Sequence, residues 1–157
     1  MGLLGLGKFA LVISVVLAPF GAVSACDALI GTIITRQLGP AIEQADCPIP
    51  GLDKPGHKLV GVCYESAGAT SKIKIDTALN CHASGESVIS KLTGGDNAPS
   101  KTENVSVEAE ARGSDCQLLS VDVKPSGELA KLAASWFGAN GKARQALQQG
   151  LNDVCKK

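Results

Sequence analysis

The chain has 157 residues with 15 basic and 15 acidic side chains, a balance that excludes the basic surface needed to bind nucleic acid or an anionic membrane. Aromatic residues make up only 3% of the sequence, so the core has to be built from aliphatic side chains, which gain less on burial than large rings. A single domain of ordinary size is therefore expected, with no nucleic-acid partner.

The first 25 residues have the features of an export signal. Lys8 precedes an apolar run over Phe9–Leu17, and the small residues Val23-Ser24-Ala25 stand before Cys26, as signal peptidase requires. The apolar stretch is too short, and too interrupted by proline and glycine, for a spanning helix of roughly 20 residues. We expect this segment to be a signal peptide, residues 26–157 to be the mature domain, and the protein to be secreted or periplasmic.

Cys26 has a second interpretation. Val23-Ser24-Ala25-Cys26 resembles a bacterial lipobox, in which the cysteine is acylated and becomes the N-terminus of a membrane-anchored lipoprotein. Valine replaces the usual leucine, and acylation would leave an odd number of cysteines for pairing. We therefore favour plain cleavage with Cys26 in a disulfide, and we expect membrane contact only if Cys26 is lipidated.

A helix is predicted from Asp27, which can cap its first turn. Apolar residues recur at steps of three and four, as on one face of an amphipathic helix. The stripe consists of Leu29, Ile30, Ile33, Ile34, Leu38, Ala41 and Ile42. Gly39-Pro40 should end or kink this helix because proline lacks the amide donor. Residues 46–57, with three prolines, should then form an irregular connector.

The centre of the chain changes to the period of strands. Leu59–Glu65 is rich in strand-forming residues, and Ser71–Leu79 alternates polar with apolar, as a half-buried strand does. A second pair, Val105–Ala111 and Leu118–Val123, should form another hairpin. Val88–Leu92 could add a short strand before a loop rich in glycine and polar residues.

The C-terminal part returns to helical periodicity over Glu128–Phe137 and Lys142–Val154. Strands that are flanked by helices, instead of alternating with them, favour an α+β domain. We predict an antiparallel sheet of four to five strands, with an N-terminal amphipathic helix and two C-terminal helices packed on one face.

Six cysteines follow the leader, an even number that predicts three disulfides in an oxidising compartment. They are Cys26, Cys47, Cys63, Cys81, Cys116 and Cys155. The sequence leaves fifteen connectivities open. None of the cysteines forms a C-x-x-C pair, so neither a zinc site nor a redox site is expected, and we predict no metal and no cofactor.

No arrangement of residues predicts catalysis. The two histidines, His57 and His82, accompany no G-x-S-x-G motif, and His82 should point away from its neighbour Cys81 if both lie on one strand. Glu108 and Glu110 share a strand face, which we interpret as the solvated side of the sheet. Asn104-Val105-Ser106 fits the acceptor pattern for N-glycosylation, which requires a eukaryotic host.

By elimination, the sequence favours a non-catalytic binding protein that recognises another protein through the sheet face or near Trp136 and Phe137, where amphipathic rings suit an interface. A second hypothesis is a carrier of lipid or another apolar molecule, held between the sheet and the face of Ile30, Ile33 and Ile34. A small hydrolase is the third hypothesis.

The intact mass of exported protein tests the leader and Cys26 together. We expect a mature chain that begins at Cys26 and has lost two hydrogens for each of three disulfides. A diacylated or triacylated Cys26 would instead add many hundreds of daltons, and would contradict the disulfide interpretation. A mass that retains residues 1–25 would contradict the predicted cleavage.

Overall fold

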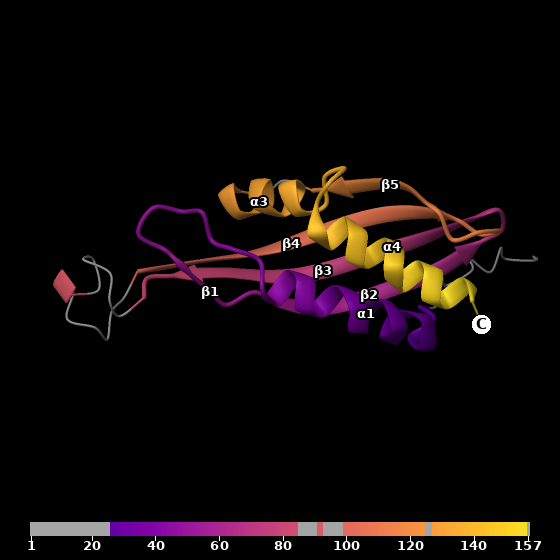
Figure 1. The fold of residues 1–157 in the computed structure, drawn as a ribbon, viewed down its shortest axis with the longest axis horizontal. Coiled ribbons are helices and arrows are strands. Elements are labelled where there is room, and N and C mark those ends of the chain that lie inside the picture. The colour runs from indigo at the N-terminus through magenta and orange to yellow at the C-terminus, as the bar shows by residue number, and fades with distance from the viewer. Residues whose placement is uncertain (1–25, 85–90, 93–98, 125–126, 157) are drawn as a thin grey trace, which may run out of the picture.

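A computed structural model describes residues 26–84, 91–92, 99–124 and 127–156. Its elements follow the order helix, sheet, two helices (Figure 1). They are α1 (Ala28–Glu43), β1 (Lys54–Pro55), β2 (Lys58–Ala67), β3 (Thr70–His82), β4 (Ser100–Arg112), β5 (Leu118–Val123), α3 (Glu128–Trp136) and α4 (Lys142–Cys155). The predicted α+β class, with strands flanked by helices and three disulfides, is confirmed.

The sheet is antiparallel throughout. β3 pairs with β4 along its whole length, β5 extends the sheet beyond β4, and β2 and β1 share the other edge of β3. The alternation predicted for Ser71–Leu79 is confirmed, because every second residue of β3 is buried. The two predicted hairpins, β2–β3 and β4–β5, form as expected.

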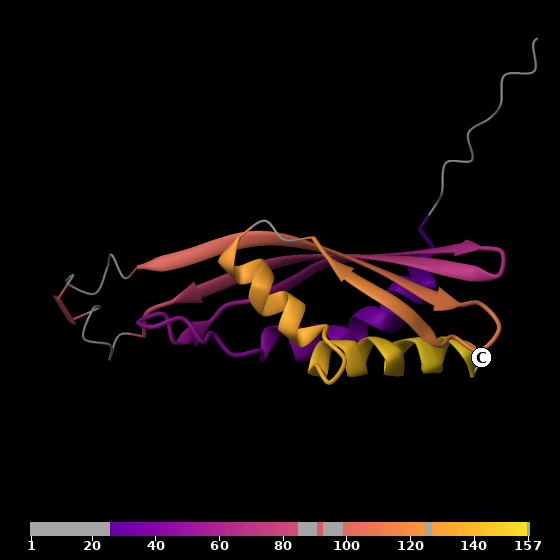
Figure 2. The same cartoon turned by 90° about the horizontal axis from the view of Figure 1, so that it is seen from above.

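The helices α1, α3 and α4 cover one face of the sheet, here called the inner face (Figure 2). The opposite, outer face bears the polar residues of the alternating strands. The largest fully buried side chains form one aliphatic core between the layers. They are Ile34, Leu38, Ile42, Ile73, Ile75, Leu79, Cys81, Val105, Val107, Leu129, Leu147 and Leu151.

α1 lies against β2 on one side and α4 on the other. Asp27 caps the helix as predicted, since its carboxylate accepts the Ile30 N–H at 3.0 Å. The approach to β2 is close at Gly31, where a β-carbon would lie 2.8 Å from the Val62 carbonyl oxygen. At the crossing with α4, a β-carbon on Gly150 would lie 3.1 Å from the Cα of Ile34. Gly31 and Gly150 therefore allow the backbone of α1 to pack closely against β2 and α4.

α3 is attached to β4 through its first turn. Its N-cap, Gly127, has no side chain to cap the helix, and the inward-facing Glu103 of β4 takes this role by accepting the Leu129 N–H at 3.1 Å. Lys101, one inward position earlier on β4, forms an ion pair with Glu128. Glu128, in the first turn of α3, also interacts favourably with the positive end of the helix dipole.

The structure departs from the sequence prediction at three places. α1 does not end at Gly39-Pro40, which was one of the two outcomes predicted there. It runs through the exposed Pro40 to Glu43, because the fully buried Ile42 holds the last turn against the core. The connector contains a two-residue strand, β1, that the sequence did not indicate. The strand predicted over Val88–Leu92 lies mostly outside the described residues, and Lys91–Leu92 are helical.

The close approach of α1 to β2 can be tested with two glycines of the same helix. Gly39→Ala should be neutral or stabilising by up to about 1 kcal/mol, because no atom lies within 4 Å of the added carbon and alanine favours helix. Gly31→Ala should destabilise the protein by about 1 to 3 kcal/mol, because the new methyl group would push α1 off the Val62 carbonyl. Denaturant unfolding of both variants measures the difference, and equal stabilities would contradict the close contact.

Candidate functional site

The three predicted disulfides are present and use all six cysteines. Cys26 is bonded to Cys63, Cys47 to Cys81, and Cys116 to Cys155. Each closes a loop of between 34 and 39 residues, for which loop entropy gives about 3 to 4 kcal/mol of stabilisation per bond. The bond to Cys63 uses the sulfur of Cys26 that acylation would need, so the disulfide and the lipid anchor exclude each other.

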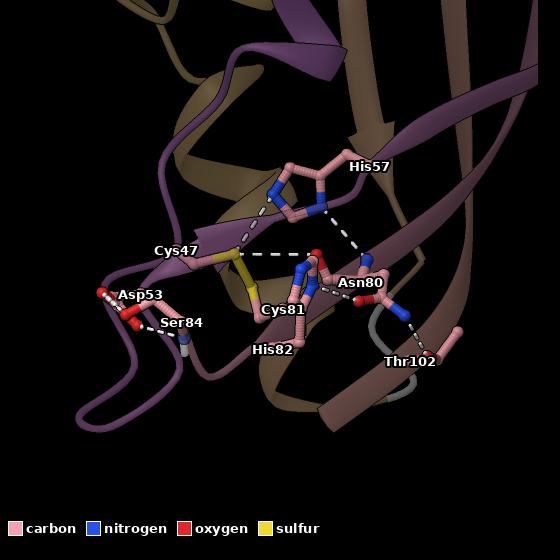
Figure 3. The surroundings of a disulfide bond; sticks show 8 residues. All are labelled: Cys47, Asp53, His57, Asn80, Cys81, His82, Ser84 and Thr102. Carbon is pink, nitrogen blue, oxygen red and sulfur yellow. Dashed lines mark hydrogen bonds between the residues drawn. A yellow bond between two sulfur atoms is a disulfide. The ribbon is translucent and has the colours of Figure 1, made fainter. Parts of the chain in front are cut away.

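The second disulfide joins the connector to the far end of β3, and His57 lies beside it (Figure 3). The imidazole is only 3% exposed. Its Nδ1 accepts the backbone N–H of Asn80 at 3.1 Å, and its Nε2 lies 3.5 Å from the Sγ of Cys47. Because Nδ1 accepts, the proton of the neutral ring is on Nε2, from which it can be donated to the Ala45 carbonyl.

Cys47, His57 and Cys81 place three metal-ligating atoms within 4.8 Å of one another. In the oxidised protein their chemistry does not suit a metal ion, since thiolate is the ligand form of cysteine and both sulfurs are shared in one covalent bond. The Nε2 atom that faces them carries the imidazole proton. The cluster is therefore a buried structural junction.

The other side of His57 packs on Trp136, at the C-terminal end of α3. The two ring centroids are 5.0 Å apart and the planes are tilted by 58°, a geometry that aromatic pairs favour. Trp136 is half-buried, and its remaining surface lines a groove of about 450 Å³, here called the Trp136 groove. Its lining comes from the end of α1, the connector, and the turn between α3 and α4: Ala41, Gln44, Ala45, Asp46, Pro48, Ser135, Trp136, Gly141, Lys142 and Ala143.

Charged groups of opposite sign flank this groove. Asp46 stands on the connector and Lys142 at the start of α4, and both side chains are exposed. Within the described part of the chain, neither forms an ion pair. The turn that carries Lys142 is tight, because a β-carbon on Gly141 would lie 1.8 Å from the Trp136 carbonyl oxygen. Glycine is thus required to bring Lys142 beside the ring.

The sequence-predicted binding residues separate in the structure. Trp136 lines the groove, whereas Phe137 is 3% exposed and belongs to the core. Ile34 is fully buried, and Ile30 and Ile33 are partly buried on α1. A ligand-sized cleft under α1 would leave accessible surface on the inward side chains, and Ile34 has none. Leu29, predicted to belong to the buried stripe, is 67% exposed.

The polar groups near the second disulfide do not form a nucleophile and base pair. The Ser84 hydroxyl donates to Asp53 at 2.9 Å, and the Ser84 N–H donates to the same carboxylate at 3.0 Å. These hydrogen bonds lower the pKa of Asp53 and fasten the connector to the chain beyond β3. His82 pairs with the Asn80 side chain at 3.2 Å, on the face opposite to the buried Cys81, as predicted. Among the described residues, neither histidine side chain forms a hydrogen bond with a serine.

The outer face carries ladders of opposite charges. Lys72 lies across from Glu110, and Lys74 lies across from Glu108. Glu108 also accepts a hydrogen bond from Lys124 at 2.6 Å, which raises the pKa of Lys124. The interpretation of Glu108 and Glu110 as solvated residues is confirmed, since both are exposed while Val107 and Ala109 between them are buried.

The sequence did not reveal that His57 meets Trp136. They are separated by nearly eighty positions, and the connector has no periodicity that would place His57 inside or outside. The sequence signal that could have indicated a buried His57 is indirect. The histidine lies ten residues after Cys47, in a segment that a disulfide must hold close to the sheet.

In the described part of the chain, no helix is both long enough and apolar enough to cross a bilayer. Comparison with protein-family models, with curated proteins and with solved structures gives no match.

The burial of His57 predicts acid sensitivity. Burial lowers its pKa below the ordinary value of 6.5, so in mildly acidic solution the unfolded chain binds a proton that the folded protein does not. Stability should be complete above pH 6.5 and should fall as the pH drops below it. Denaturant unfolding between about pH 7.5 and 5 measures this slope.

His57→Gln should flatten that slope, while the matched variant His82→Gln should retain it because His57 is still buried. Asp53 and Glu128 also have lowered pKa values, but their ordinary values are 3.8 and 4.5. Both carboxyl groups are therefore mainly ionised over this pH range. An unchanged slope in His57→Gln would show that another group carries the pH dependence.

Proposed function

We propose that this protein is an exported, non-catalytic binding protein that recognises a partner protein through the Trp136 groove. Three disulfides are typical of the extracellular space or the periplasm, which agrees with the predicted leader. The observation that carries the proposal is the half-buried Trp136, the sole tryptophan of the chain. It shares a groove with Asp46 and Lys142, two charges of opposite sign that form no ion pair within the described residues, and it packs on the buried His57.

The Trp136 groove suits recognition because the indole ring is held in place from behind. One side of Trp136 rests on His57, which is itself fixed by the Asn80 amide and by the disulfide at Cys47. A preorganised aromatic side chain contributes more to binding than a mobile one, since less conformational entropy is lost. Tryptophan is also enriched among the residues that dominate binding energy at protein interfaces.

The charges define the partner chemistry. Asp46 favours a basic group and Lys142 an acidic group, so the fitting segment presents an apolar side chain to Trp136 between a basic and an acidic neighbour. Complementary charges of this kind set orientation and association rate more than affinity. The outer face of the sheet differs, because its acidic and basic side chains already compensate one another across the strands.

The apolar-ligand carrier is the second candidate, and Trp136 is again the residue that would report it. A lipid would enter the same groove, and its binding should raise the thermal stability of the protein, because a ligand of the native state stabilises it. Fatty acids and phospholipids therefore belong in the same titration as peptides.

Site-directed photocrosslinking tests the proposal. A photoreactive residue at Gln44, in the groove, should give a covalent adduct with one partner in extracts of the native secretions or envelope, whereas the same residue at Lys72, on the outer face, should give none. The adduct should disappear in the charge-reversal variants Asp46→Lys and Lys142→Glu. With the partner identified, these variants should weaken binding by about tenfold or more, measured by Trp136 fluorescence.

Lys72→Glu serves as the matched charge reversal on the outer face and should leave affinity unchanged. Adducts from Lys72 and not from Gln44 would move the interface to the sheet. Tight binding of a fatty acid or phospholipid that quenches Trp136, without any protein adduct, would establish the carrier instead.

A further inference from the structure

Asn104 stands on the outer face of β4 with its side chain exposed. It begins Asn104-Val105-Ser106, the one place in the sequence that fits the N-glycosylation acceptor pattern. Its amide makes no hydrogen bond with any residue that the structure describes, and Val105 between the two polar positions is buried in the core. The folded protein can therefore carry a large substituent on this nitrogen without any rearrangement of the core.

The sheet around Asn104 leaves room for a large substituent. β5 ends its pairing opposite Val107, and beyond it the Lys124 N–H donates to the Ser106 carbonyl. Among the residues that the structure describes, no strand pairs with this edge of β4 at Asn104. On the other side its cross-strand neighbour is Ala78, whose methyl group is too small to cover it.

A shallow groove adjoins Asn104, here called the Val60 groove. It has a volume of about 390 Å³ and is lined by Val60, Asp76, Thr77, Asn104, Val105 and Ser106. Val60 stands at the irregularity in the pairing of β2 with β3 and is 67% exposed. The groove thus combines apolar surface with the polar Asp76 and Ser106, which are hydrogen-bonded to each other. A saccharide offers both kinds of surface.

We propose that Asn104 carries an N-linked glycan, added in a eukaryotic secretory pathway, and that the first sugar lies in the Val60 groove. The co-reactant is an oligosaccharide linked to a lipid diphosphate. A bond forms between Nδ2 of Asn104 and the anomeric carbon, the bond from that carbon to the diphosphate oxygen breaks, and the amide loses one proton as the lipid diphosphate leaves.

The transfer has to precede folding of the sheet. In the folded protein the Ser106 hydroxyl, which the acceptor pattern requires, is engaged by Asp76, and the backbone of Asn104 is paired with Ala78. An unfolded chain that is passing through a membrane during export has both groups free. Once the sheet forms, the glycan projects from the outer face, away from the helices that build the Trp136 groove.

The test uses protein secreted from a eukaryotic host with its own leader. Mass spectrometry of the tryptic peptide Thr102–Arg112 should show a glycan that peptide N-glycanase removes, leaving aspartate at the acceptor position. The glycan should be lost in Asn104→Gln and in Ser106→Ala, but retained in Ser106→Thr, which keeps the hydroxyl group.

Arg112→Asn supplies an internal reference, because it creates a second acceptor pattern with Gly113 and Ser114 in the exposed turn after β4. Glycan at the reference position with an unmodified Asn104 would overturn the proposal. Secretion of Asn104→Gln at normal yield shows that the loss of glycan is not a loss of folding.

A double-mutant cycle of Asn104→Gln and Val60→Ser tests whether the first sugar contacts the Val60 groove. The glycosylated protein should have a higher Tm than Asn104→Gln, and this difference should shrink in the Val60→Ser background, because serine removes apolar surface that the sugar covers. An equal difference in both backgrounds would place the sugar elsewhere.

Discussion

The Cys47–Cys81 disulfide is the constraint on which the end of the molecule that holds the Trp136 groove depends. The connector between α1 and β2 has almost no regular structure, and this covalent bond holds it against the end of β3. The bond also closes the space around His57, whose ring can then bond to Asn80 on one side and pack on Trp136 on the other. The disulfide at the end of β3 thus fixes His57, and His57 in turn fixes the ring of Trp136 on α3.

The parts of the fold that repeat were predictable from the sequence. The alternation over Ser71–Leu79 defines which residues of β3 face the core, and the apolar stripes place α3 and α4 to within a residue or two. Of the two outcomes predicted at Gly39-Pro40, an end of the helix is wrong, because burial of Ile42 outweighs the amide that proline lacks. Tertiary packing decides such cases.

The sequence indicated the central residue of the candidate site but not the residues around it. Trp136 could be selected because a lone tryptophan at a helix end suits a surface, but its neighbour Phe137 could not be separated from it without knowing which way the last turn faces. The charged residues that share the groove with Trp136 come from other segments: Asp46 from the connector, which has no periodicity, and Lys142 from the first position of α4. Convergence of such residues is set by disulfide pairing, and the sequence left fifteen pairings open.

The order of the cysteines along the chain has a consequence for biogenesis. Two bonds, between Cys26 and Cys63 and between Cys47 and Cys81, interleave between residues 26 and 81, so both can close before the segment that follows β3 has been made. The third joins Cys116 to Cys155, the last residue of α4. That bond therefore needs both β4 and α4, and its closure is coupled to the docking of α4.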